Sequence, residues 1–288
     1  MLAIYEKELK SYFHSMIAYL FLTVLWAASG VYFTVYCLYY GYMDFGQYVL
    51  SSITILFIII VPVLTMRLMA DEKKQKTDQL FLTAPVRVSS VILGKYLAVL
   101  TLFAIGLLGV FCYSILLSFF GDMVWRTNLT AFLGFFLMGA CFLAIGIFIS
   151  CCTESQVAAA AISFGVVLAC FLLPNVVSLA PGRARYTFVM AAVAIICLAL
   201  FFYHETYSIW IGGAAGGVGI LALVAAWIAK PSGFDDGFSK IVDWISILDR
   251  YDNFLNGILD GSSIIYYLSF IGVFLYLSIQ TIEKKRWI

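Results

Sequence analysis

The sequence predicts an all-α polytopic membrane protein, and its composition is the first observation behind this prediction. Of the 288 residues, 64% are hydrophobic and 11% are charged, whereas an ordinary soluble domain has about 25% charged residues. A soluble globule of this size could not hide so much apolar surface, because roughly a quarter of the unfolded chain's area stays exposed after folding. The lengths of the apolar runs and the placement of Lys and Arg between them point to the same class.

The apolar residues gather into eight runs of membrane-spanning length. A bilayer core about 30 Å thick needs roughly 20 apolar residues of helix. The predicted spans are 17–39, 49–69, 95–119, 130–151, 156–179, 185–203, 208–229 and 262–281. Only His204, Glu205 and a few polar residues separate the sixth run from the seventh, so these are either two short spans or a hairpin that does not fully cross.

The positively charged residues set the predicted orientation, because cytoplasmic loops carry an excess of Lys and Arg. One side of the topology comprises the N-terminus, the 67–95 loop, the turns at 152–155 and 204–207, and the C-terminal tail. That side holds eleven of the seventeen basic residues: Lys7, Lys10, Arg67, Lys73, Lys74, Lys76, Arg87, Lys95, Lys284, Lys285 and Arg286. Both termini are therefore predicted to be cytoplasmic.

The first fifteen residues predict a short amphipathic helix ahead of the first span. Apolar side chains recur with partial helical spacing from Leu2 to Phe13, and Glu6, Lys7, Glu8 and Lys10 are interleaved with them. Such a helix lies in the plane of the inner membrane surface. The alternative is a plain, positively charged flank of the first span.

The longest inner loop, residues 67–94, predicts a second short helix. A charge-rich stretch, Asp71 to Lys76, precedes the apolar residues Leu80, Phe81 and Leu82. Thr77 or Asp78 can cap a helix here, and Pro85 ends it, because the residue before a proline leaves the helical region. This helix is expected to project from the inner face, with Lys73 and Lys74 as rim charges. A solvated charged loop is the alternative.

Residues 230–261 form the third piece that does not span, on the outer side. Apolar residues between Phe238 and Ile258 follow helical spacing with a break near Tyr251. The segment also holds six carboxylates: Asp235, Asp236, Asp243, Asp249, Asp252 and Asp260. Helical periodicity spreads most of them over a solvated face, which we favour over a metal site. One or two amphipathic helices at the outer surface are expected.

The sequence lacks the motifs that several kinds of chemistry require. Gly94-Lys95 lacks the preceding glycine and the following Ser or Thr of a Walker A loop, so the chain cannot hydrolyse ATP by that route. We expect no catalytic residues, no metal site and no nucleic-acid partner. The spans hold almost no ionisable residues away from their ends, which argues against an ion-coupled carrier. Gly134, Gly139 and Gly146 are expected to permit close helix packing.

These absences leave several functional classes open. A transporter without its own energy source needs a separate protein to supply energy through the inner loop. The same pattern fits a membrane scaffold that anchors a secretion or motility machine without conducting anything. A membrane enzyme acting on lipid is a third class, and the lack of a buried catalytic cluster counts against it.

An ordered set of short motifs resembles the membrane subunit of type-2 ABC transporters, and more narrowly the gliding-motility-type permeases. The set comprises Val61-Pro62-Val63-Leu64-Thr65-Met66-Arg67, the stretch from Thr77 to Pro85, and Gly94-Lys95-Tyr96. The segments Glu6 to Leu9, Thr153 to Gln156, Asp249 to Gly257, Ile264 to Leu268 and Glu283 to Trp287 also resemble that family. The chain departs from it where Lys76-Thr77-Asp78-Gln79 replaces the usual Gly-Thr-Ile-Glu, and in residues 180–235.

The resemblance implies an exporter in a bacterial cell (plasma) membrane, driven by a dimer of separate ABC ATPase subunits that bind ATP and Mg. It also implies a second permease subunit and a companion membrane protein with a large extracytoplasmic domain. The ATPase would dock on the inner loop. The residues expected there are Asp71, Glu72, Thr77, Asp78, Leu80, Phe81, Leu82 and Pro85.

Overall fold

The structure is a computed structural model, and it describes residues 1–76, 87–179 and 246–286. All regular elements within these ranges are helical. The chain divides into one unit formed by Met1–Phe171 with Ile247–Ile288, and a second formed by Leu172–Ser246. The account below concerns the first unit. The predicted spans 185–203 and 208–229 lie outside the described residues, as do 77–86 and 230–245.

Five of the predicted spans are confirmed, within the described ranges, as helices long and apolar enough to cross a membrane. The first, Met16–Tyr39, is α2 (Met16–Tyr32) continued by the π-helix η1 (Phe33–Tyr39). The third, fourth and last are α7 (Val88–Leu117), α8 (Trp125–Cys152) and α14 (Gly261–Arg286). The predicted run 156–179 coincides with helix α9 (Gln156–Leu179). Its apolar part, Gln156–Leu172, is shorter than the five candidate spans.

The second span is irregular along its length. It runs from Gly46 to Lys74 and is built from successive short helical pieces. These are η2 (Gly46–Leu50), α3 (Ser51–Ile53), η3 (Thr54–Leu56), α4 (Phe57–Thr65) and α5 (Ala70–Lys74). Pro62 lies inside α4, and a turn at residues 66–69 separates α4 from α5. That turn leaves backbone groups without helical partners at the end of the span.

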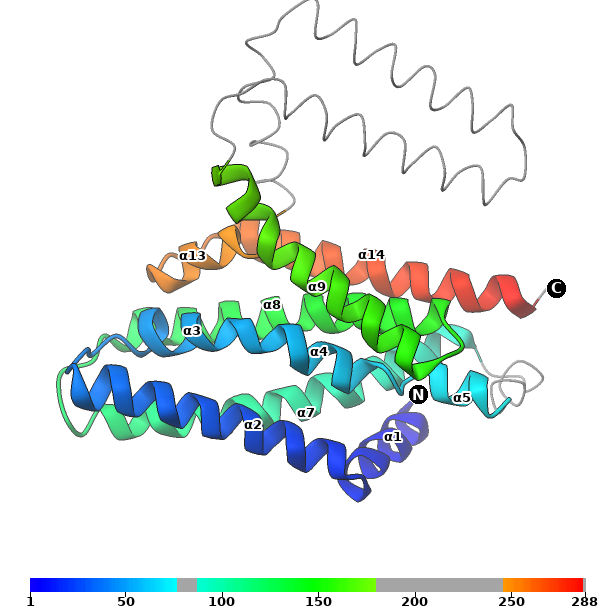
Figure 1. The fold of residues 1–288 in the computed structure, drawn as a ribbon, viewed down its shortest axis with the longest axis horizontal. Helices are drawn as coiled ribbons and strands as arrows, with labels where there is room; N and C mark the ends of the chain where they lie inside the picture. Colours follow the sequence, from blue (N-terminus) through cyan, green and yellow to red (C-terminus); the bar gives the residue numbers. More distant parts are fainter. Residues whose placement is uncertain (77–86, 180–245, 287–288) are drawn as a thin grey trace, which may run out of the picture. The chain divides into compact units, whose positions relative to one another are not determined.

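Helix α8 is the central helix of this unit. Its most apolar stretch is 78% buried, against 50% or less in the other four candidate spans. It packs against α14, α4 and α7, as Figure 1 shows, and against α13 (Asp249–Leu255). Three glycines of α8 lie where neighbouring helices come closest: Gly134 beside Phe254, Gly139 beside Phe103, and Gly146 beside Thr65. The predicted close packing at these glycines is confirmed.

Gly146→Ala is expected to lower the free energy of unfolding by about 1–3 kcal/mol, the usual cost of overpacking a core. The added Cβ would lie 2.8 Å from the Cβ of Thr65, an atom fixed to its backbone. Chemical denaturation of the detergent-solubilised chain would measure the loss. Gly272→Ala is the matched control, because nothing lies within 4 Å of its Cβ position in the exposed face of α14. Equal stability of the two variants would contradict the assigned contact.

The N-terminal segment is helical, as predicted, over α1 (Leu2–His14). It packs on α7 and on the start of α2 (Figure 1). A Cβ on Gly94 of α7 would lie 3.3 Å from the carbonyl oxygen of Met1, so the glycine permits the close approach of these two helices. The buried hydroxyl of Tyr12 donates a hydrogen bond to the Leu64 carbonyl oxygen at 2.7 Å. Helix α1 is therefore joined to both α7 and the end of α4.

The end of the segment predicted to lie outside forms α13, which contacts α8. The helix described around the change of spacing near Tyr251 is α13, which begins at Asp249 and buries Tyr251 with Phe254 and Leu255. One of the one or two expected helices is therefore present within the described residues. Asp260 accepts hydrogen bonds from Ser262 and Ser263 at the start of α14, and these bonds lower the pKa of its carboxyl.

Candidate functional site

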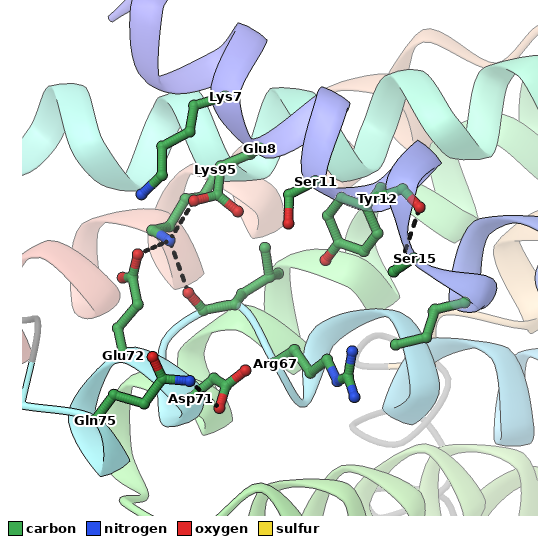
Figure 2. Close-up of a pocket in the computed structure, with 12 residues that line it drawn as sticks. Lys7, Glu8, Ser11, Tyr12, Ser15, Arg67, Asp71, Glu72, Gln75 and Lys95 are labelled. Atoms are coloured by element: carbon green, nitrogen blue, oxygen red, sulfur yellow. Dashed lines mark hydrogen bonds and ion pairs between the residues drawn. The ribbon is translucent and has the colours of Figure 1, made fainter.

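Residues of α1, the start of α2, the turn after α4, α5 and α7 line a small polar cavity of about 170 Å³ (Figure 2). One wall belongs to α1 and the residues after it, and the other to residues 67–75, with Lys95 of α7 between them. The lining residues are Lys7, Glu8, Ser11, Tyr12, Ser15, Ile17, Arg67, Leu68, Asp71, Glu72, Gln75 and Lys95. The cavity therefore lies between the N-terminal helix and the start of the predicted ATPase-docking loop.

Lys95 is the centre of this site. Its side chain is 2% exposed, and its ammonium nitrogen lies 2.9 Å from Oε1 of Glu8 and 2.9 Å from Oε1 of Glu72. The ammonium also donates to the carbonyl oxygen of Leu68 at 2.9 Å. An ammonium carries three N–H donors, so these three acceptors use all of them. A buried charge is tolerated when it is paired and hydrogen-bonded in this way.

The local chain geometry supplies the third acceptor. Residues 66–69 form the turn between α4 and α5, so the Leu68 carbonyl is turned away from a regular helical ladder and accepts the bond from Lys95 instead. Helix α7 begins at Val88, about two turns before Lys95. Lys95 therefore lies within α7 and not at its start. It follows Gly94, the residue at which α1 approaches α7.

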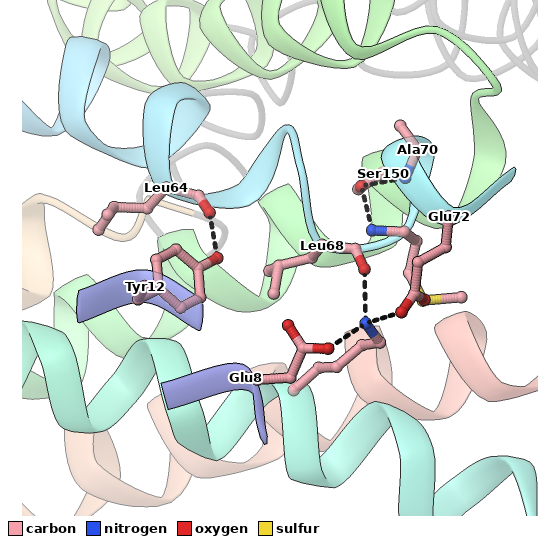
Figure 3. Close-up of polar contacts among 9 residues, drawn as sticks. Glu8, Tyr12, Leu64, Leu68, Ala70, Glu72 and Ser150 are labelled. Atoms are coloured by element: carbon pink, nitrogen blue, oxygen red, sulfur yellow. Dashed lines mark hydrogen bonds and ion pairs between the residues drawn. The ribbon is translucent and has the colours of Figure 1, made fainter. Parts of the chain in front are cut away.

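Helix α5 is fixed on its other side to the end of α8 (Figure 3). The hydroxyl oxygen of Ser150 accepts hydrogen bonds from the backbone N–H groups of Met69 at 3.1 Å and Ala70 at 3.2 Å. The first backbone N–H groups of a helix have no hydrogen-bond partner within that helix, so Ser150 supplies the partner here. The Lys73 ammonium donates to the Cys151 carbonyl oxygen, a favourable position for a cation because it is the C-terminal end of α8.

The expectation that Lys73 is a rim charge is wrong, since its side chain is buried and bonded to α8. Lys74 is exposed, in agreement with that expectation. The difference follows from the helical character of α5, which turns one of two adjacent lysines toward α8 and the other away from it.

Tyr12 adds a neutral bond to the site. Burial raises the pKa of its hydroxyl well above the ordinary value, and the nearby Glu8 carboxylate acts in the same direction. The hydroxyl therefore stays protonated at physiological pH and remains a donor to the Leu64 carbonyl oxygen. Tyr12 thus attaches α1 to the end of α4, and Glu8 attaches it to Lys95 of α7.

Two of the predicted docking residues fall in the described structure. Asp71 accepts a hydrogen bond from the side-chain amide of Gln75 at 3.3 Å, and Glu72 turns inward to Lys95. The other predicted docking residues lie outside the described ranges: Thr77, Asp78, Leu80, Phe81, Leu82 and Pro85. Their contact with an ATPase stays a prediction.

Sequence reasoning missed Glu8 and Lys95 as site residues. Lys95 was placed at the edge of a span, where a lysine needs no special partner. The signal that could have found it is the uncharged stretch of Val88 to Leu93 ahead of it, which lengthens the helix and places the lysine inside it. An ionisable residue inside a membrane-spanning helix usually pairs with another polar group, so a partner should be sought for it.

The arrangement joins helices and shows no set of reactive groups. In the described part of the chain, no group of three or more His, Cys, Asp or Glu side chains is placed to hold a metal ion. The donors of Lys95 are taken by the protein itself. What the site does is hold α1, α5, α7 and α8 together at one end of the unit.

A comparison with protein families matches nearly the whole chain. The family model described as "ABC-2 family transporter protein" matches residues 2–282. A comparison with curated proteins gives no significant match.

Proposed function

This chain belongs to the ABC-2 family of transporter proteins, as a membrane subunit without an ATPase domain, and from this premise we propose that it is the permease of an ATP-driven exporter. Membership over residues 2–282 is the observation that carries the proposal. Energy would come from a pair of separate ABC ATPase subunits that bind ATP and Mg. A second permease, either the same chain or a related one, would complete the pathway.

The inner loop is the proposed docking segment for the ATPase. Its first part contains α5, which is bonded to α8 through Ser150 and Lys73 and to α7 through Glu72. A displacement of the loop would therefore be transmitted to the membrane-spanning helices α7 and α8 through short, buried contacts. Closure of the ATPase pair would move these helices and open or close a path between the two permeases.

The test of this function is purification of the tagged chain in mild detergent, followed by mass identification of its partners. We expect an ATPase with a Walker A loop and ATP hydrolysis that requires Mg. A companion membrane protein with a large extracytoplasmic domain would fit the same complex. Recovery of secretion or motility components without any ATPase would favour the scaffold function instead.

The proposed orientation places both termini and the loop after α5 in the cytoplasm of a bacterial cell. A single cysteine at position 74, where Lys74 is exposed, is expected to react with a membrane-impermeant reagent only after the inner face has been opened. The native cysteines are replaced beforehand, because Cys112 and Cys152 are also exposed. Labelling at position 74 in intact cells would contradict the proposed orientation.

A further inference from the structure

The three-way ion cluster joins two segments that are far apart in the sequence. Glu8 comes from α1 and Glu72 from α5, and both carboxylates bind the one ammonium of Lys95 in α7. Figure 2 shows the two acidic side chains reaching Lys95 from opposite sides. Lys95 therefore serves as the common partner of the N-terminal helix and of the helix that leads into the inner loop.

We propose that Lys95 is a positioning residue for the transport cycle, which keeps α1 and α5 in one fixed arrangement so that a movement of the inner loop also moves α1. The proposal rests on the proposed function for its role in transport, but the fixed arrangement itself is a property of the chain alone. Lys95 has no chemical part in the cycle.

The cavity is the first argument for this role. It lies between α1 and residues 67–75, so packed side chains leave part of the space between these two segments unfilled. The three residues of the ion cluster are among those that line it. Glu8 and Glu72 are only 13% and 15% exposed, so water screens their attraction to Lys95 less than it would at an open surface. The linkage between α1 and α5 therefore depends on the ion pairs more than on apolar contact.

The second argument is that each helix has its own attachment elsewhere. Helix α1 is held by Tyr12 on Leu64 and by the close approach at Gly94. Helix α5 is held on α8 by Ser150 and Lys73. Both helices should therefore remain folded and docked when the ion cluster is removed without leaving a buried charge. What changes is how tightly their relative position is fixed.

The experiment measures the distance between spin labels on α1 and α5 by electron–electron double resonance. Cysteines at the exposed positions Glu6 and Lys74 carry the labels, in a chain whose native cysteines are replaced. The test variant is the neutral combination Glu8→Gln, Glu72→Gln and Lys95→Met, which leaves no unpaired charge. Lys10→Met is the control, because it removes one lysine charge from an exposed position of α1.

We expect one narrow distance distribution in the parent chain and in Lys10→Met, and a broader, shifted distribution in the neutral variant. In the complex with its ATPase, the neutral variant should transport less substrate per ATP hydrolysed than the parent chain. A distribution unchanged by the neutral variant would overturn the proposal. If the parent chain shows the narrow distribution but no ATP-driven transport, the proposed function fails while the positioning of α1 and α5 stands.

Discussion

Replacing Lys95 with methionine is expected to lower the free energy of unfolding by about 3–5 kcal/mol, because breaking a buried ion pair leaves an uncompensated buried charge. Here two carboxylates, Glu8 and Glu72, would lose the same partner while remaining largely buried. The Leu68 carbonyl oxygen would lose its donor as well. The loss should be measured by chemical denaturation of the detergent-solubilised chain.

Two further variants separate this explanation from a simple loss of packing. Adding Glu8→Gln and Glu72→Gln to Lys95→Met removes the stranded charges and should restore much of the lost stability, since a neutral buried cluster avoids the desolvation of ions. Lys10→Met should behave like the parent chain, because its side chain is exposed. Lys95→Met as stable as Lys10→Met would mean that the cluster contributes nothing to the fold.

Phe81→Ala is expected to uncouple ATP hydrolysis from transport and to weaken binding of the ATPase. A buried aromatic anchor typically contributes about 2 kcal/mol or more at an interface, which is a factor of about 30 in affinity. Phe81 lies between Leu80 and Leu82 in the proposed docking segment. We expect a segment this short to form its helix on the ATPase surface, since isolated helices below about 12–15 residues are marginal in water.

The measurement is recovery of the ATPase with each variant at matched expression, together with hydrolysis and transport in the reconstituted complex. Lys74→Ala is the control, because an exposed rim charge contributes little to affinity. Lys73→Ala is unsuitable, since Lys73 is bonded to the Cys151 carbonyl oxygen inside the permease. Full recovery of the ATPase with Phe81→Ala and loss with Lys74→Ala would mean that the contact is electrostatic.

The sequence predicted the membrane class and five spans because hydropathy and length are local properties of the chain. It predicted the close approach at Gly134, Gly139 and Gly146 for a similar reason, since small residues in an apolar helix have few other uses. Lys73 was misjudged because its partner, Cys151, is 78 residues away and no local pattern links the two. The same limit applies to Lys95 and Glu8.

Hydropathy also sets the ends of a span less well than its middle. The third span was predicted to begin at residue 95, whereas α7 begins at Val88. The added residues end next to Gly94, where α1 packs closely on α7, a contact that hydropathy does not report.

The distances along the chain between bonded partners have a consequence for biosynthesis. Glu8 emerges from the ribosome early, but its cation follows 87 residues later. The backbone N–H of Met69 is synthesised 81 residues before its acceptor, the hydroxyl oxygen of Ser150. The first two spans are therefore synthesised before the ends that carry α1 and α5 have these partners. In a nascent chain arrested before residue 150, α1 and α5 should be cleaved by added protease, and both should become resistant once α8 has been completed.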